Sequence, residues 1–277
     1  MEQSLTKKIL KVCAASLLAV SSFSYSSPAP YQLSPLENYL IKSFAWEQYE
    51  SFVNTGASTL FENPKVYYFS AGSLAKNVLK NPTEFIQKYK GQKVFVEGVL
   101  SRYSPSKSTF VFDASDNKFI INIKMGEDHN TETHPSLRKN FYCQVAHAKK
   151  NEIILENCIT GLDYQKVKID EIEQGIKNFL SGKDKTNPNM PTYAMLAYMA
   201  LVSAKLLPSH SCCQAAAIDE GPQTTADIRA CNQEVTTLWQ NNSQFENFND
   251  AMDSVERDLM RHGADLNMVR KAASLMD

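Results

Sequence analysis

The chain has 277 residues, with 29 Lys and Arg against 30 Asp and Glu, so its formal net charge at pH 7 is −1. This balance excludes a protein that attracts nucleic acid or membranes through its overall charge. Without an expected leader, about 250 residues remain, enough for one large domain or two small ones.

The first 26 residues have the layout of a cleavable export signal. Three lysines form a basic lead, an apolar run follows to Val20, and small residues end at Ser26. The run is too short to span a bilayer, which needs about 20 apolar residues. We expect residues 1–26 to be removed, leaving a periplasmic or secreted chain with no transmembrane anchor; a retained N-terminal anchor is the alternative.

Residues 27–72 are expected to form an N-terminal helical segment. Apolar residues recur at helical spacing from Ser34 to about Val53. Two shorter helices are expected near 73–79 and 83–89, before the pattern changes to that of strands.

From Lys93 to Thr160 apolar residues alternate with period two, which predicts β-strands. Gly98 lies inside the first strand, where the missing side chain permits a bend. Five strands, with a helical turn expected at 133–140 after the third, form the pattern of an OB-fold, a small β-barrel. The expected strands are 94–100, 108–115, 118–125, 141–148 and 152–160.

The run LAKNVLKNPTEFIQKYKGQKVFVEGVLSRY, followed later by LENC, resembles the tRNA-anticodon-like OB-fold family of bacterial envelope proteins. The resemblance covers residues 73–161 and implies the barrel fold. It supplies no catalytic residues, and it implies no transfer-RNA activity for an exported protein. Gln92 and Lys93 depart from the family's usual entry to the first strand. The matching residues are Asn81, Pro82, Tyr89, Lys90, Gly91, Gly98, Asn157 and Cys158.

Residues 162–277 are expected to form a separate C-terminal helical domain, so the predicted fold class is α+β. The stretch 190–207 is apolar nearly all round but contains Lys205, which favours a buried central helix over a membrane span. The helices are expected near 164–180, 190–207, 223–240, 245–262 and 265–276.

Cys143 lies seven residues before Lys150, and Cys158 lies seven residues after Asn151, so the two cysteines are placed symmetrically about a turn at these two residues. Folding the chain there sets the two cysteines opposite each other, with Val145 opposite Glu156, and places both sulfurs on the face away from the barrel core. A disulfide across this loop stabilises by about 3 kcal/mol on the chain-entropy model. Buried free thiols are the alternative; redox catalysis is disfavoured because no C-x-x-C is present.

Cys212, Cys213 and Cys231 are the other cysteines after the leader. In an oxidising compartment we expect a disulfide from Cys231 to either neighbour of the vicinal pair. The leftover thiol could join a partner or a second copy. A zinc site using His210, Cys212 and Cys231 is the alternative, disfavoured because vicinal cysteines do not easily both bind one ion.

The sequence shows no catalytic motif. S-x-x-K occurs at several places, among them Ser73, Ser104 and Ser136, but without the other elements of the enzymes that use it. Neither G-x-S-x-G, H-E-x-x-H nor a phosphate-binding glycine loop occurs. We therefore predict a protein that is not an enzyme and needs no cofactor.

OB-folds bind single-stranded nucleic acid where aromatic rings lie beside a basic groove. The barrel segment has a modest excess of Lys and Arg, so a nucleic-acid or ligand face is a candidate. Its residues would be Phe95, Tyr103, Lys118, Lys124, Arg138 and Lys139.

The leading hypothesis is an exported, non-enzymatic binding or assembly module of the bacterial cell envelope, whose partner is an envelope protein or peptide. A periplasmic nucleic-acid-binding protein is the first alternative. A thiol or metal-binding protein using the Cys212 cluster is the second.

Overall fold

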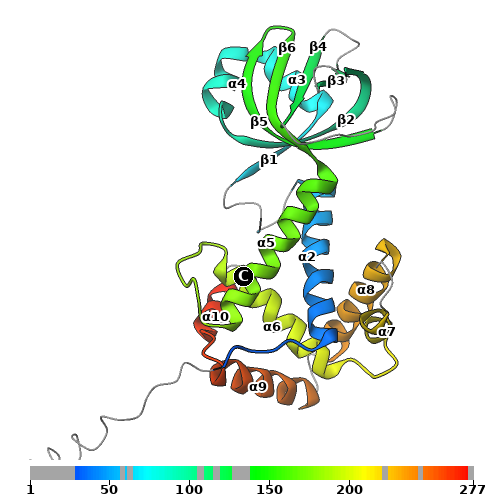
Figure 1. Ribbon diagram of the computed structural model, residues 1–277, viewed down its shortest axis with the longest axis vertical. Coiled ribbons are helices and arrows are strands. Elements are labelled where there is room, and N and C mark those ends of the chain that lie inside the picture. Colours follow the sequence, from blue (N-terminus) through cyan, green and yellow to red (C-terminus); the bar gives the residue numbers. More distant parts are fainter. Residues whose placement is uncertain are drawn as a thin grey trace, which may run out of the picture.

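The computed structural model describes residues 29–56, 60, 65–104, 109–114, 119–126, 138–219, 224–242 and 246–273. A β-barrel lies at one end and a group of helices at the other, and helices α2 (Pro35–Thr55) and α5 (Gly161–Leu180) run between them (Figure 1). The expected leader lies outside the described residues. Within the described part, no helix combines the length and apolar character needed to cross a membrane.

The barrel has the strand order of an OB-fold. β2 pairs with both β3 and β5, which closes five strands in the order β2-β3-β4-β6-β5. β4 and β6 run parallel, and the other neighbours in the barrel run antiparallel. The α+β class and the OB-fold-like barrel are thus seen in the structure. The strands are β1 (Val66–Ser70), β2 (Lys93–Ser104), β3 (Thr109–Ala114), β4 (Phe119–Met125), β5 (Arg138–Lys149) and β6 (Glu152–Thr160).

Strand β1 was not predicted from the sequence. It pairs in parallel with the first half of β2. Tyr67 and Phe69 pack against the barrel core, whereas Val66 and Tyr68 pack against the core of the helices. Because both faces are apolar, the alternation that marks a half-exposed strand disappears.

Helices α3 (Ala71–Lys80) and α4 (Pro82–Tyr89) cover one end of the barrel. Gly98 makes this possible, since a Cβ there would lie 2.8 Å from the Cβ of Ala71 and 3.1 Å from the Phe112 ring. Its missing side chain thus permits a close approach of α3 to the barrel wall.

Gly98→Ala should therefore destabilise the protein by roughly 1–3 kcal/mol, because the added methyl group must displace packed neighbours. Gly72→Ala is the matched control: Gly72 lies in α3, and a Cβ there meets nothing within 4 Å. We expect the control to be neutral or stabilising by up to about 1 kcal/mol. Urea unfolding of both variants measures the difference, and equal effects would contradict the close approach.

The β5–β6 hairpin follows the predicted register only at its two ends. Ala148 faces Ile153 near the turn, and Phe141 faces Thr160 at the far end. Between them the register shifts twice, so that Val145 faces Leu155. The predicted pairing of Val145 with Glu156 is therefore wrong.

The two shifts also overturn the predicted position of the cysteines. Cys143 and Cys158 lie at disulfide distance, with sulfurs 2.08 Å apart, but both are fully buried in the barrel core rather than on its outer face. The reason is an extra residue in each strand, Ala146 in β5 and Asn157 in β6. Each bulge reverses the inward and outward alternation beyond it. Asn157 has the positive φ of 51° that such a position tolerates in asparagine.

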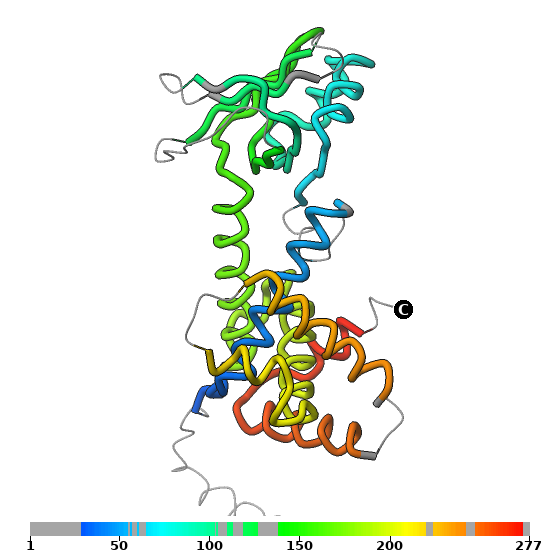
Figure 2. The backbone as a smooth tube through the Cα atoms, turned by 90° about the vertical axis from the view of Figure 1, so that its right-hand side faces the viewer, coloured from blue at the N-terminus to red at the C-terminus, as the bar shows by residue number. Residues whose placement is uncertain are grey.

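The helices share one hydrophobic core around α6. As expected, α6 is a buried central helix, with Tyr193, Ala197 and Leu201 all at most 1% exposed. α2 packs against α5, α6, α7 and α8, although the sequence placed it in an N-terminal segment of its own (Figure 2). The helices are α6 (Met190–Leu206), α7 (Cys212–Ile218), α8 (Thr225–Asn242), α9 (Glu246–Arg261) and α10 (Leu266–Ala273).

The barrel and the helices meet at an aromatic cluster centred on Phe95 of β2. The Phe95 side chain is 0% exposed, and the rings of Tyr49, Phe52, Tyr68 and Tyr164 surround it at centroid distances of 5.5 to 6.4 Å. Phe95 therefore cannot present its ring to a ligand, as the sequence analysis proposed, because α2 and α5 cover this part of the barrel wall.

Candidate functional site

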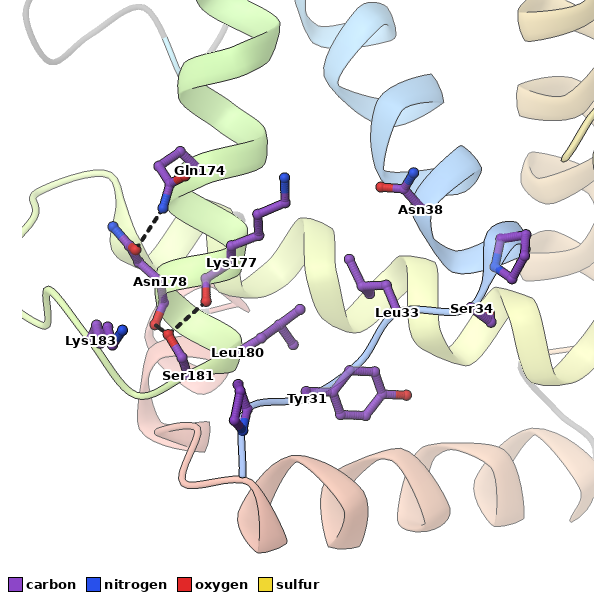
Figure 3. Close-up of a pocket in the computed structure, with 12 residues that line it drawn as sticks. Tyr31, Leu33, Ser34, Asn38, Gln174, Lys177, Asn178, Leu180, Ser181 and Lys183 are labelled. Carbon is purple, nitrogen blue, oxygen red and sulfur yellow. Dashed lines mark hydrogen bonds between the residues drawn. The ribbon is translucent and has the colours of Figure 1, made fainter. Parts of the chain in front are cut away.

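A groove with a volume of about 710 Å³ lies between the start of α2, the end of α5 and residues 29–34, which we call the N-terminal arm (Figure 3). The arm crosses toward α9, where His262 Nδ1 lies 2.6 Å from the carbonyl oxygen of Ala29. The Tyr31 ring packs edge-on against His262. These contacts make the arm one wall of the groove.

The local sequence explains how the arm joins α2. Ser34 caps the helix by accepting a hydrogen bond from the Glu37 N–H, and the Glu37 carboxylate accepts one from the Ser34 N–H. The same carboxylate accepts the Tyr31 hydroxyl at 2.9 Å. Burial first, and then Glu37, raise the pKa of Tyr31 above its ordinary range, so its hydroxyl stays neutral.

Two polar side chains reach into the groove from opposite walls. Asn38 points out from α2, and Lys177 extends from α5 toward it (Figure 3). Within the described part of the chain the Asn38 amide has no hydrogen-bond partner. The Lys177 ammonium forms only a long ion pair, 3.9 Å from the Glu173 carboxylate. Leu33 and Leu180 supply apolar surface between them. The groove thus offers an amide, a cation and an apolar floor.

Two other polar side chains of the groove are already engaged. Gln174 donates to the Asn178 side chain at 3.0 Å. The Ser181 hydroxyl donates to the carbonyl oxygen of Lys177 at 2.8 Å. Asn38 and Lys177 are therefore the groups best placed to meet a ligand, and sequence reasoning singled out neither.

The sequence left open which of Cys212 and Cys213 pairs with Cys231, and the structure shows that it is Cys213. Cys213 and Cys231 lie at disulfide distance, 2.07 Å apart, and both are fully buried. Cys212 is exposed and forms no disulfide, and its thiol donates a hydrogen bond to the Glu234 carboxylate at 2.8 Å. In the described part of the chain, the groups brought within 4.8 Å of one another are those of Cys212, Cys213 and Glu234, without His210.

This arrangement does not suit a structural zinc ion. Such an ion takes four ligands, and the sulfurs of Cys213 and Cys231 are held in their bond to each other. Cys212 and Glu234 alone remain. Burial first, and then Glu234, raise the pKa of the Cys212 thiol to about 11, which keeps it protonated and weakly nucleophilic at neutral pH.

Alkylation of Cys212 by iodoacetamide should therefore be slow at pH 7.5 and accelerate with pH toward about 11. Glu234→Gln removes the nearby negative charge, lowers the thiol pKa and should raise the rate at pH 7.5 several-fold. Mass spectrometry of the alkylated chain measures both rates. An unchanged rate in the variant would show that Glu234 does not hold the proton on this thiol.

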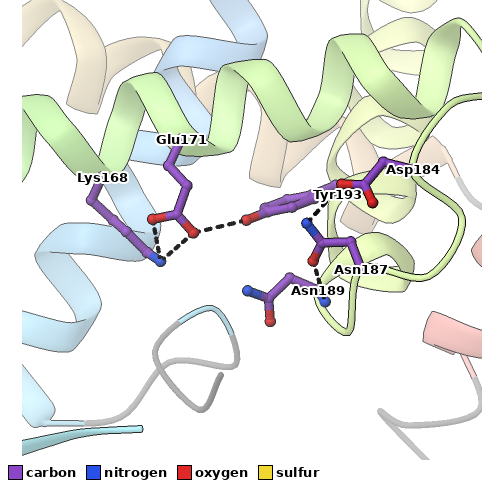
Figure 4. Close-up of polar contacts among 6 residues, drawn as sticks. All are labelled: Lys168, Glu171, Asp184, Asn187, Asn189 and Tyr193. Carbon is purple, nitrogen blue, oxygen red and sulfur yellow. Dashed lines mark hydrogen bonds and ion pairs between the residues drawn. The ribbon is translucent and has the colours of Figure 1, made fainter. Parts of the chain in front are cut away.

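A second polar cluster lies between α5 and α6 (Figure 4). Lys168 is 3% exposed, and its ammonium lies 3.0 Å from both carboxylate oxygens of Glu171. The Tyr193 hydroxyl donates to the same carboxylate at 3.2 Å. Gly175 lets the Tyr193 ring lie against α5, since a Cβ there would be 2.3 Å from the ring. The cluster therefore joins the two helices.

If this role is structural, replacing Lys168 and replacing Glu171 should change the free energy of unfolding by different amounts. Lys168→Met replaces a buried charge with an apolar side chain of similar length and should be neutral or stabilising. Glu171→Ala leaves the buried ammonium without its counter-charge and should destabilise by about 1–3 kcal/mol. Urea unfolding compares them, and a larger loss for Lys168→Met would contradict the expectation.

Of the residues predicted to form a nucleic-acid face, Phe95 is buried beneath the helices, and three others can be placed on the barrel strands. Arg138 forms an ion pair with Glu97 on β2, and Lys139 is half-buried. Lys124 is exposed on β4. The Tyr103 side chain and Lys118 lie outside the described residues, as does most of the expected helical turn at 133–140, whose last three residues belong to β5.

No protein-family model matches this chain, and no curated protein matches it. The resemblance to the tRNA-anticodon-like OB-fold family thus remains an interpretation of short sequence motifs. The barrel itself follows from the strand order.

Proposed function

We propose that this chain is an exported, non-enzymatic binding module of the bacterial cell envelope, which holds a peptide segment of an envelope protein in the groove. The observation that carries the proposal is that Asn38 and Lys177 line one groove from opposite walls, with Leu33 between them. Ligand pockets combine a mostly apolar lining with a few convergent polar groups and usually measure about 300–1,000 Å³. The groove volume of about 710 Å³ lies within that range.

The groove chemistry suits a peptide that carries a negative charge. The Asn38 amide can both donate to a peptide carbonyl and accept from a peptide N–H. The Lys177 ammonium suits an acidic side chain or a terminal carboxylate, and Lys183 adds a second cation at the edge. Leu33 and Leu180 would contact an apolar side chain of the same segment.

The same groove does not favour catalysis. Its serine hydroxyls contact the backbone: Ser34 accepts from the Glu37 N–H, and Ser181 donates to the Lys177 carbonyl. Tyr31 stays neutral for the reasons given above. Among the lining side chains, no nucleophile lies beside a general base, the pairing that covalent catalysis requires.

Two disulfide-distance pairs support an oxidising compartment. Such bonds persist in the periplasm and outside the cell but are rare in the cytosol. The export expected from the N-terminal sequence and the cysteine pairing therefore agree with each other.

Photo-crosslinking in the native cell envelope tests the groove. A photoreactive phenylalanine analogue at Asn38 should yield a defined adduct with one envelope protein, identified by mass spectrometry. Asp253, an exposed residue of α9, is the matched control position and should yield none. Adding Lys177→Glu should reduce the Asn38 adduct at least tenfold, because it replaces attraction with repulsion.

Two results would contradict the proposal. One is the absence of an adduct at Asn38 in correctly folded protein. The other is the same adducts at Asn38 and Asp253, which would indicate random encounters rather than a bound segment.

A further inference from the structure

The end of the barrel opposite the groove carries a concentration of positive charge. Between residues 65 and 93 the chain has six lysines and a single acidic residue, Glu84. The whole chain has a net charge of −1, so this charge is local. The segment forms α3 and α4, which cover one end of the barrel, and β1, which lies on the side of the barrel nearer the helices (Figure 1).

Two of these lysines line one small pocket between α3 and α4. Lys80 is the last residue of α3, Lys88 lies in the last turn of α4, and the pocket volume is about 120 Å³. That volume equals the space of about four water molecules, the scale of one phosphate group. Within the described residues no carboxylate forms an ion pair with either lysine. Glu84, also in the lining, accepts a hydrogen bond from the Asn81 side chain.

A pair of tyrosines continues the pocket toward β1. Tyr89 lines the pocket, and its ring meets the Tyr67 ring edge-on at 5.0 Å. The Lys88 ammonium lies 5.1 Å from the centroid of the Tyr89 ring, and the Lys65 ammonium lies 5.6 Å from that of Tyr67. Both side chains are half-buried, and the Tyr89 ring also packs against Phe69 at 5.6 Å and Phe85 at 4.6 Å. We call Lys65, Tyr67, Lys80, Lys88 and Tyr89 the basic-aromatic strip.

We propose that the basic-aromatic strip is a binding site for single-stranded nucleic acid, separate from the groove. A phosphate enters the pocket between Lys80 and Lys88, and the neighbouring bases contact the tyrosine rings. A base that stacks on either ring displaces the ammonium over it, which then turns to the adjacent phosphate. Alternating cations and rings are the means by which proteins bind single strands without sequence preference.

The rings favour nucleic acid over other polyanions. Every base offers a planar ring that can stack on a tyrosine, whereas a carboxylate or a lipid phosphate offers only its charge to the lysines. The site also differs from the face predicted from the sequence, whose residues lie on other strands or beneath the helices.

Fluorescence anisotropy of the mature chain with a short labelled oligothymidylate tests the strip over a range of salt concentrations. The logarithm of the affinity should fall linearly with the logarithm of salt. The double variant Lys80→Gln, Lys88→Gln should make that slope shallower by about 0.7, since the two lysines hold one phosphate and each phosphate contact to a single strand contributes roughly that amount. The matched control is Lys166→Gln, Lys185→Gln, two exposed lysines elsewhere, which should leave the slope unchanged.

The tyrosines separate this proposal from charge alone. Tyr67→Leu should weaken binding at least about fivefold with little change in slope, because it removes a stacking surface. Tyr67→Phe keeps the ring and should bind like the unaltered chain. Thermal unfolding of both variants identifies any loss that comes from misfolding.

Three outcomes would overturn the proposal. The first is no binding at low salt. The second is equal binding by Tyr67→Leu and Tyr67→Phe when both are folded. The third is equal competition by polyglutamate or by vesicles of anionic lipid, which would assign the lysines to another polyanion.

Discussion

The burial of Phe95 between the barrel wall and two helices is the contact on which the rest of this structure depends. Four aromatic rings surround a side chain with no exposed surface, and they come from α2, β1 and α5. α5 begins at Gly161, directly after β6, and the Tyr49 hydroxyl of α2 donates to the Gly161 carbonyl at 2.7 Å. Both helices are thus oriented by the barrel. Their far ends form the groove, so its width depends on packing at the opposite end of the same helices.

The same contact decides which surfaces of the barrel remain for binding. Tyr142 of β5 stacks on Tyr164 of α5 at 3.9 Å, so the helices cover the outer side of β5 as well as that of β2. OB-folds often bind ligands on the barrel wall. Here part of that wall is used to hold the helices, whereas α3 and α4 cover one end of the barrel. The proposed groove and the proposed basic-aromatic strip are therefore separate surfaces.

The two cysteine pairs stabilise the two cores separately. Cys143 and Cys158 join bulged strands inside the barrel, and Cys213 and Cys231 join α7 to α8 inside the helical core. The fifth cysteine, Cys212, is next in sequence to a bonded one but is exposed. Burial and, after it, the hydrogen bond to Glu234 raise the pKa of this thiol and keep it protonated, which slows its exchange with the neighbouring disulfide.

The sequence determined the elements whose signals are local. Period-two alternation located the five strands of the barrel, helical spacing from Ser34 located α2, and the spacing around the turn paired Cys143 with Cys158. The charge concentration of the barrel end was also present in the sequence, as six lysines against one glutamate between residues 65 and 93. Its significance was missed because composition does not show which lysines lie together.

Tertiary structure alone decided the remainder. β1 shows no alternation because both of its faces pack against an apolar core, and the two bulges place the cysteines in the barrel core instead of on its outer face. The choice of Cys213 over Cys212 depends on which side of α7 faces α8. Asn38 and Lys177 are far apart in the chain. They line the same groove only because α2 and α5 pack into one core. Periodicity shows that a residue faces inward or outward; which distant segment it then meets depends on long-range packing, which local patterns do not encode.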